Sequence, residues 1–361
     1  MTSRERALAV LNYEKYDEFP LVHFGFWSET IQKWKEEGHI KDGEDPAKKA
    51  GFDFEWIGNC HGGRTGVFPG FERKLIETLP DGSQKVMDGN GVIQLVKPGI
   101  RSIPAEIDHT LKDRASWEKD FKHRVQYCEE RVSQGLIDKL KAIDKDKCDA
   151  PLGLHLGSLF GYVRDWVGFE AVSYIYIDDE PLFDEIIDTL GDTTYRVAEK
   201  ILNAGIKFDI AHFWEDICFK NGPLVMPEVF EEKVGKHYKK VCGLCNKHGI
   251  NIISLDCDGW IDALVPIWLK NGVNTMFPIE VGTWNASIAP WREKYGKDLR
   301  GVGGMNKNVF ARDKAAVDAE IERLKPLVAL GGYIPCPDHR IAPDAKWENV
   351  VYYCEQMRKT F

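Results

Sequence analysis

The chain has 361 residues, of which 43% are hydrophobic and 29% charged, and its formal net charge is -9 at pH 7. This length suits two average domains or one large α/β barrel, and we expect a single barrel domain over residues 1–361. The acidic balance argues against nucleic acid and anionic membranes as partners, because both select basic surfaces. No apolar run approaches the roughly 18 residues that a membrane span needs.

The N-terminus and the cysteines indicate the compartment. Residues 1–6 lack the apolar core of a signal peptide, so we expect a cytoplasmic protein. Nine cysteines are scattered along the chain. This odd number predicts reduced thiols rather than a disulfide framework.

The first part of the chain predicts one helix, two strands and a β-hairpin insertion. Thr2 and Glu5 fit a capping box for a helix that runs through Leu11. Strand-like runs follow at residues 19–27 and 52–57. Residues 62–103 combine Gly, Pro and alternating polarity, which predicts a β-hairpin insertion within the barrel.

The rest of the chain alternates strand-like runs with amphipathic helical stretches. The further strands are predicted at 151–158, 208–216, 251–258, 273–280, 299–305 and 332–336. This rhythm predicts an α/β fold of the (βα)8 TIM-barrel class. Barrels of this class carry their chemistry at the carboxyl ends of the strands.

Carboxylates stand at the end of the fifth predicted strand. Side chains alternate across a strand, so Asp256 and Asp258 share one face. Two carboxylates this close need a proton or a cation between them. The alternative is a pair of ordinary capping aspartates in an exposed loop before Gly259.

Other strand ends add further acid and imidazole groups. Glu280 ends the sixth strand and His339 follows the eighth. With Asp256 and Asp258 they are candidate catalytic residues, and Asp258, Glu280 and His339 are candidate zinc ligands. The same groups equally suit acid–base chemistry without a metal, and a structural role is the alternative for His339.

The fourth strand ends in Glu215 and Asp216, and periodicity leaves open which of the two faces the pocket. Glu215 is a candidate catalytic residue. For Asp216, the alternative is that it ties down the loop that follows.

Tryptophans also gather at the strand ends, which predicts an aromatic-lined pocket for a flat ligand. The five tryptophans at or just after these ends are Trp27, Trp56, Trp214, Trp260 and Trp284. The expected substrate-binding residues are His23, Trp27, Trp56, His155 and Trp214. The alternative is rim packing or subunit contacts, and a homodimer is left open.

The order of these motifs resembles the uroporphyrinogen decarboxylase-like family over essentially the whole length, in particular its methyltransferase branch. The motifs are Gly157–Gly161 with Trp166–Glu170, Trp214–Asp216 with Lys220–Pro223, Asp256–Gly259, Phe277–Glu280, Gly303–Lys307, and Gly332–Pro335 with Asp338–Arg340. The resemblance implies a methyltransferase that works with a corrinoid protein. The thiol-methylating members carry a His-x-Cys and a later Cys as zinc ligands, and those places fall here on Asp256, Asp258 and His339.

The absence of both thiolate ligands at these positions changes which substrate we expect. Oxygen ligands would leave a zinc more Lewis-acidic, which suits an ether oxygen rather than a thiol. We therefore expect transfer of a methyl group from an aromatic methyl ether to the cobalt of a partner's corrinoid (cobalamin), the first step of anaerobic O-demethylation. Two alternatives stay open: a decarboxylase of a carboxylated aromatic or tetrapyrrole, which predicts at least two arginines near the strand ends, and a non-catalytic corrinoid- or tetrapyrrole-binding barrel.

Overall fold

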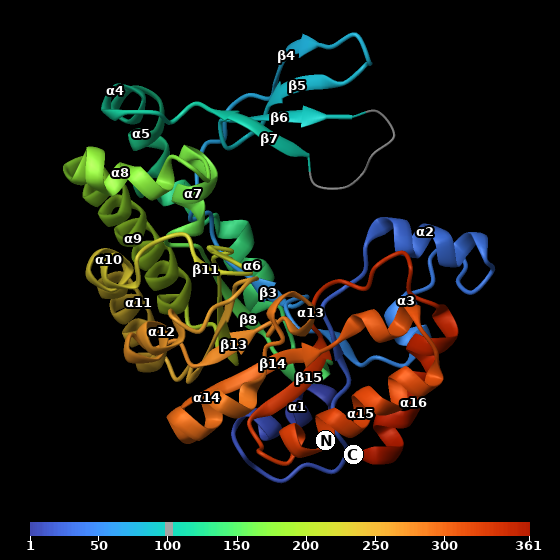
Figure 1. The fold of residues 1–361 in the computed structure, drawn as a ribbon. Coiled ribbons are helices and arrows are strands. Elements are labelled where there is room, and N and C mark those ends of the chain that lie inside the picture. Colours follow the sequence, from blue (N-terminus) through green and yellow to red (C-terminus); the bar gives the residue numbers. More distant parts are fainter. Residues whose placement is uncertain (98–103) are drawn as a thin grey trace.

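The structure is a computed structural model that describes residues 1–97 and 104–361. Its centre is a parallel sheet of seven strands in the order β15-β14-β13-β12-β9-β8-β3 (Figure 1). A separate parallel pair, β1-β2, precedes it in the chain. The strands are β1 (Val22–His23), β2 (Phe54–Glu55), β3 (Cys60–His61), β8 (Gly153–Gly157), β9 (Ile210–Trp214), β12 (Ile252–Asp256), β13 (Thr275–Phe277), β14 (Arg300–Met305) and β15 (Tyr333–Pro337).

The sheet curves around a shared interior. Side chains from strands that are not neighbours meet there: the Phe24 and Phe277 ring centroids are 4.4 Å apart, and Trp56 Nε1 donates to Ser254 Oγ at 3.3 Å. A parallel bridge between Phe26 and Ile341 ties the chain after β1 to the chain after β15. The fold is therefore mixed α/β around a central parallel sheet, and each of the eight predicted strand segments contains one strand of the sheet or of the β1-β2 pair.

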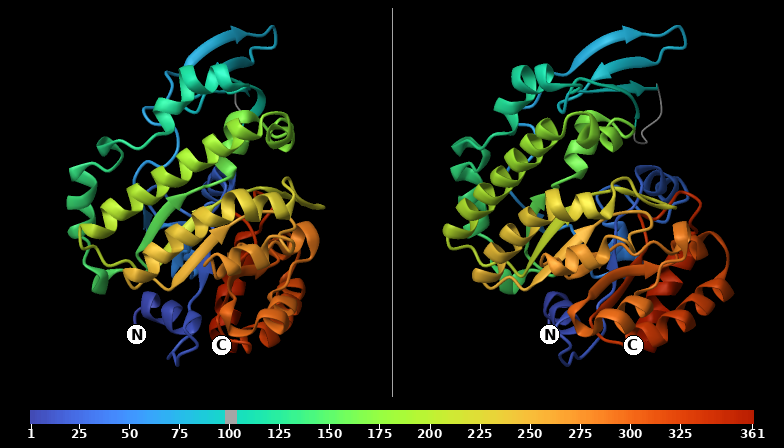
Figure 2. Two further views of the ribbon diagram at one scale, coloured as in Figure 1. Left: turned by 90° about the vertical axis from the view of Figure 1, so that its left-hand side faces the viewer. Right: turned by 60° about the vertical axis from the view of Figure 1, so that its left-hand side comes forward.

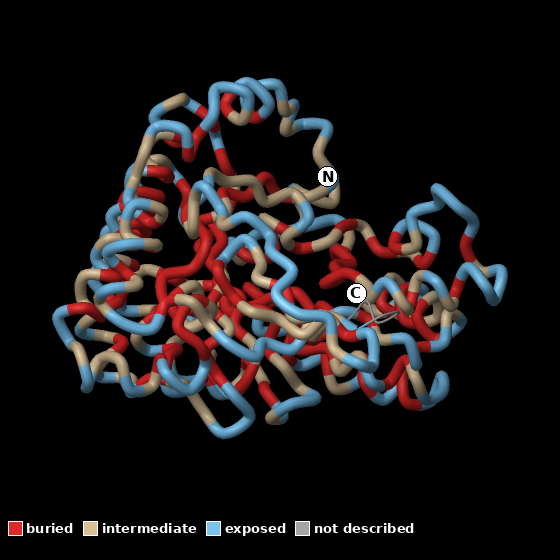
Figure 3. The backbone as a smooth tube through the Cα atoms, turned by 90° about the horizontal axis from the view of Figure 1, so that it is seen from above, coloured by how far each residue is buried: buried red, intermediate tan, exposed pale blue. Residues whose placement is uncertain are grey.

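Helices cover the outside of the sheet, and the longest of them, α9, runs along it in Figure 2. Central strands such as β12 are buried on both faces, which explains their continuous apolar sequence. The tube view shows buried segments gathered in the middle of the molecule (Figure 3). The main helices are α1 (Ser3–Leu11), α2 (Ser28–Glu36), α3 (Pro46–Ala50), α6 (Gln134–Lys141), α7 (Gly161–Val167), α8 (Val172–Asp178), α9 (Glu180–Asn203), α10 (Pro227–Phe230), α11 (Lys236–Lys247), α12 (Val265–Lys270), α13 (Val281–Trp284), α14 (Ile288–Tyr295), α15 (Lys314–Val328) and α16 (Trp347–Thr360).

Two local predictions are confirmed. The Thr2 hydroxyl accepts from the Glu5 N–H while the Glu5 carboxylate accepts from the Thr2 N–H, which completes the capping box of α1. All nine cysteines are free thiols. Among the described residues, no helix combines the length and the apolarity that crossing a bilayer requires.

The excursion after the second strand is a four-stranded antiparallel sheet, which projects from the rest of the molecule in Figure 1. Its strands are β4 (Lys74–Thr78), β5 (Gln84–Met87), β6 (Val92–Val96) and β7 (Ala105–His109). The sheet continues past the predicted boundary at residue 103, because β7 adds to the edge of β6. Residues 98–103 of the predicted excursion lie outside the described part of the chain.

A close backbone contact gives a test of this packing. Gly303 in β14 has φ +127°, and a Cβ there would lie 1.6 Å from the Pro278 carbonyl oxygen. We expect Gly303→Ala to lower the free energy of unfolding by about 3 kcal/mol or more, because both φ and space exclude a side chain. Urea denaturation measures this.

The control is Gly135→Ala in α6, where a Cβ meets nothing within 4 Å. It should leave stability unchanged or raise it by up to about 1 kcal/mol. Equal stability of the two variants would contradict this account of the β13-β14 contact.

Candidate active site

A buried polar layer lies inside the sheet below its carboxyl ends. Ser254 Oγ accepts from Trp56 Nε1 and lies 3.1 Å from His212 Nδ1. Burial lowers the pKa of His212 well below its usual value, so the ring is neutral. Trp56 is fully buried in this layer, so the substrate contact predicted for it would need a ligand to reach the interior. The His155 ring lies half-buried at 5.8 Å from that of His212.

Three aspartates meet one layer above, at the carboxyl ends of β9 and β12. One ligand atom from each of Asp216, Asp256 and Asp258 lies within 4.8 Å of the others. Asp256 and Asp258 share a face as the alternation predicts. Asp216 is fixed by two donors: the Asp258 N–H at 3.1 Å and Trp214 Nε1 at 2.9 Å.

This acid trio, Asp216, Asp256 and Asp258, is electrostatically strained. Burial, followed by the neighbouring carboxylates, raises the pKa of Asp256 well above its usual value. Burial and the charge of Asp258 raise the pKa of Asp216 to about 6. Asp216 also has φ +48°, a left-handed conformation that costs about 1–3 kcal/mol outside glycine. The trio therefore favours a shared proton or a bound cation.

Glu280 and His339 flank the trio. Glu280 Oε2 accepts from the Gly259 N–H at 2.6 Å, and burial, followed by the charge of Asp258, raises the pKa of Glu280. His339 Nε2 lies 3.3 Å from Asp258 Oδ2. Both groups are thus beside Asp258, as the sequence predicts.

The cluster that could hold a metal differs from the predicted one. Within residues 1–97 and 104–361, the acid trio is the single group of three or more such side chains whose ligand atoms converge within 4.8 Å. Of the predicted ligands Asp258, Glu280 and His339, it contains only Asp258. One oxygen of Glu280 instead accepts from the Gly259 N–H. Asp258 Oδ1 is buried without a hydrogen-bond partner among the described residues, and an unsatisfied carboxylate oxygen fits a divalent cation.

Glu215 does not belong to this site. Its buried carboxylate accepts from the N–H groups of Leu159, Phe160 and Gly161 at 2.9, 2.9 and 2.6 Å, where α7 begins. The Tyr238 hydroxyl donates to it as well. With its oxygens occupied on the outer side of the sheet, Glu215 acts as an anchor for α7, at odds with the predicted catalytic role. The alternation that aims Trp214 at the mouth already places Glu215 on the opposite face.

Aromatic rings border the trio on two sides. The Trp27 ring stacks on His339, with centroids 5.8 Å apart and planes at 22°, and Phe24 lies 5.3 Å from the same imidazole. On the other side, Trp214 donates to Asp216. Trp27 and Trp214 thus both lie next to residues of the strand-end cluster, and their contact with a substrate stays a prediction.

The remaining tryptophans and His23 lie elsewhere. Trp260 and Trp284 stack on each other with centroids 6.2 Å apart, and Trp284 makes a tilted contact with Trp291 at 6.1 Å. His23 points to the outer face of β1, because Phe24 beside it points inward. The prediction that His23 shares a pocket with the strand-end acids therefore does not match the structure.

Two arginines at the mouth were not among the predicted site residues. The guanidinium carbon of Arg164 lies 5.7 Å from the Trp214 ring centroid, and that of Arg340 lies 5.7 Å from Trp27. Their charges partly offset the raised pKa of Asp216 and Asp256 respectively. Arg340 directly follows His339 after the last strand, so the sequence could have predicted that it lies at the mouth. Arg164 belongs to α7, and its position in the sequence gave no such indication.

No family model and no curated protein matches the sequence. The chain is similar in structure to a methyltransferase from Methanosarcina mazei, with a TM-score of 0.64, 15% identity and coverage of 99% of this chain and 98% of that one. It also aligns with a putative vitamin-B12-independent methionine synthase from Listeria monocytogenes, with a TM-score of 0.44, 14% identity and coverage of 96% and 98%. The first similarity shows that the fold is shared over the full length.

The anchoring role of Glu215 can be measured. We expect Glu215→Ala to lower the free energy of unfolding by about 3–5 kcal/mol, because three buried N–H groups and the buried hydroxyls of Ser158 and Tyr238 lose their acceptor. Glu215→Gln should cost less, since its amide oxygen still accepts. Glu228→Ala, an exposed position in α10, should change stability by less than about 0.5 kcal/mol. A Glu215→Ala protein as stable as the Glu228→Ala control would refute the anchor.

Proposed function

We propose that the protein is a methyltransferase that moves a methyl group from an aromatic methyl ether to the cobalt of a corrinoid carried by a partner protein. The observation that carries the proposal is a carboxyl group, Asp256, whose pKa is raised well above its usual value at a mouth bordered by Trp27 and Trp214. Methyl transfer from an ether needs such a group, because the phenolate that departs must be stabilised. The fold shared with a methyltransferase supports the proposal.

The chain's residues have distinct parts in this reaction. Trp27 and Trp214 would stack the aromatic ring and direct its ether oxygen at the acid trio. As the C–O bond breaks, the oxygen keeps the electron pair and takes the proton of Asp256. The electron pair for the new bond to the methyl carbon comes from the acceptor, a Co(I) corrinoid. Asp216 and Asp258 sustain the proton on Asp256 by like-charge repulsion.

The acid trio also fits a divalent cation. Asp216, Asp256 and Asp258 would hold it, and the unpartnered Oδ1 of Asp258 is a free ligand atom. A zinc ion bound there would take the place of the proton on Asp256, because ligands must be deprotonated, and it would then supply Lewis acidity to the ether oxygen in place of proton donation. His339, beside Asp258, would then orient that carboxylate.

A second candidate function is supported by Arg164 and Arg340. A decarboxylase of an aromatic or tetrapyrrole acid needs cationic groups to hold its carboxylates, and both arginines lie over rings at the mouth. Against it, the acid trio would repel a polycarboxylate. The two functions differ in product, because only decarboxylation releases carbon dioxide without cobalt.

Turnover distinguishes the two functions. We expect the protein to methylate cob(I)alamin with a methoxylated benzoate, followed by the change in cobalt absorbance. Asp256→Asn should slow the reaction on the order of 100-fold or more, because it removes the acidic proton. Asp42→Asn, at an exposed carboxylate paired only with Lys35, should react at the wild-type rate.

Carbon dioxide release from the same benzoate without cobalt, and no methyl transfer with any methyl ether tested, would establish the decarboxylase instead. Equal rates for Asp256→Asn and Asp42→Asn would remove Asp256 as the proton donor.

Metal content tests the cation separately. We expect about one zinc per chain, and we expect chelation to stop methyl transfer without unfolding the fold, which buries its core without a metal. Asp216→Asn and Asp258→Asn should lose the zinc, while Glu280→Gln, at a carboxylate held by a backbone N–H, should retain it. A metal-free protein with full activity in chelator would leave the trio with acid–base chemistry alone.

A further inference from the structure

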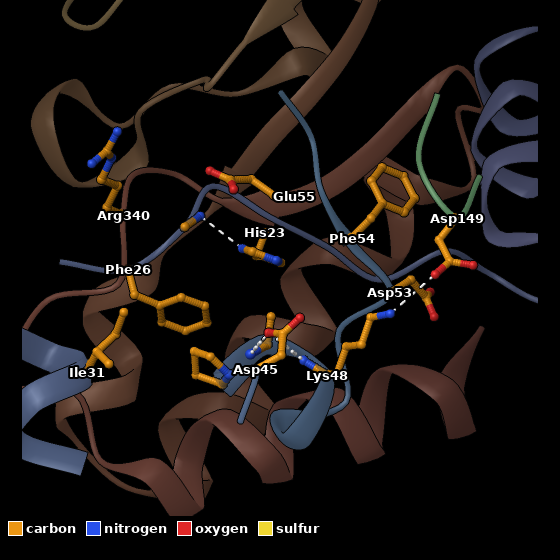
Figure 4. Close-up of a pocket in the computed structure, with 13 residues that line it drawn as sticks. His23, Phe26, Ile31, Asp45, Lys48, Asp53, Phe54, Glu55, Asp149 and Arg340 are labelled. Atoms are coloured by element: carbon orange, nitrogen blue, oxygen red, sulfur yellow. Dashed lines mark hydrogen bonds and ion pairs between the residues drawn. The ribbon is translucent and has the colours of Figure 1, made fainter. Parts of the chain in front are cut away.

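A second cavity lies on the outer side of β1 and β2, under α2 and α3 (Figure 4). Its volume is about 430 Å³, within the range of small-molecule sites. The wall of β1 separates it from the acid trio, because Phe24 faces the trio while His23 faces the cavity. Figure 4 shows the His23 ring among the lining residues, with Glu55, Phe26 and Asp45 around it.

His23 presents one defined hydrogen-bond donor to this cavity. The side chain is 5% exposed, and Nδ1 accepts from the Gly25 N–H at 2.9 Å. Burial lowers the pKa of His23 to about 4, so the ring is neutral and its proton is on Nε2. No hydrogen bond from that Nε2 is found among the described residues, so the N–H is available to an acceptor that enters the cavity.

Glu55 and Arg340 provide opposite charges at the same cavity; the charge of Arg340 partly offsets the raised pKa of Glu55, but no ion pair within 4.0 Å involves either side chain in the described part of the chain. Glu55 is the register neighbour of His23 across the β1-β2 pair, which puts the two side chains on one face. The Glu55 carboxylate has no hydrogen bond or ion pair within the described chain, and burial raises its pKa. Arg340 likewise has no carboxylate within 4.0 Å there; its nearest defined contact is the Trp27 ring.

Apart from Asp45, the other charged side chains that line the cavity are already paired. Asp53 pairs with Arg358 at 2.7 Å, and Asp149 pairs with Lys48 at 3.4 Å. Asp45 uses one oxygen, Oδ1, to cap α3.

Asp45 Oδ2 and the Glu55 carboxylate therefore remain as acceptors for a cationic group. Arg340 and His23 Nε2 remain as donors for an anionic group. Phe26 and Ile31 form an apolar wall beside these polar groups.

We propose that this cavity binds a zwitterion of amino-acid size with an apolar side chain. Glu55 and Asp45 accept from the ammonium group. Arg340 and His23 Nε2 donate to the carboxylate, and the side chain packs against Phe26 and Ile31. Arg340 belongs to both the cavity and the mouth, since its guanidinium also covers Trp27.

Calorimetry on the whole chain tests the site with three matched probes: L-leucine, isoamylamine, which lacks the carboxylate, and 4-methylpentanoate, which lacks the ammonium. L-leucine should bind, and each analogue should bind at least about tenfold more weakly, because one charged hydrogen-bonded group is lost. The measurement uses neither corrinoid nor methyl donor, so it is independent of the proposed methyl transfer.

Glu55→Gln and Arg340→Met should each weaken L-leucine binding at least about tenfold. Glu77→Gln, a carboxylate in β4 paired with Lys85, is the matched control and should bind as wild type. Arg340 is exposed, so Arg340→Met tests the site even if Glu55→Gln fails to fold. Absence of L-leucine binding at about 10 mM, analogues that bind as well as L-leucine, or an Arg340→Met protein with wild-type affinity would each overturn the proposal.

Discussion

The chemistry of this protein depends on three carboxylates confined at one end of a parallel sheet. Asp216, Asp256 and Asp258 converge because β9 and β12 are hydrogen-bonded neighbours in register, with Trp214 opposite Asp256. Like charges at this distance in a partly dry site cannot all ionise freely. The three carboxylates therefore favour a bound proton or a bound cation, and the proposed methyl transfer uses one or the other.

The role of a buried acid in this fold depends on its hydrogen-bond partners and not on how deeply it is buried. Glu215 and Asp338 are both nearly inaccessible, yet backbone N–H groups satisfy their oxygens and make them anchors. Asp338 accepts from Val281, Gly282 and Lys307, which joins the end of β15 to the start of α13. Among the residues that the structure describes, none is a hydrogen-bond partner of the buried Oδ1 of Asp258, and an unsatisfied acceptor can bind a ligand. Adjacent residues such as Glu215 and Asp216 can thus have opposite roles.

The two faces of β1 serve two different environments. Phe24 packs inside the sheet against Phe277 and His339, while His23 opens to the outer cavity. Arg340 connects the two, because it follows His339 and reaches both Trp27 and the outer cavity. Its charge partly offsets the raised pKa of Glu55 on the outer side and of Asp256 on the inner side.

The sequence by itself determined the parallel α/β architecture, the positions of the parallel strands other than β3, and the shared face of Asp256 and Asp258, because these follow from local periodicity. The inward direction of Trp214 and the outward direction of Glu215 could also be predicted, because side chains alternate between the two faces of a strand. Only the tertiary structure decided that Asp216 joins the trio, that Glu215 binds the start of α7, and that Arg164 and Arg340 reach the mouth. These outcomes depend on which backbone N–H groups and which neighbouring strands come within hydrogen-bonding distance, and that information is not local to any stretch of the chain.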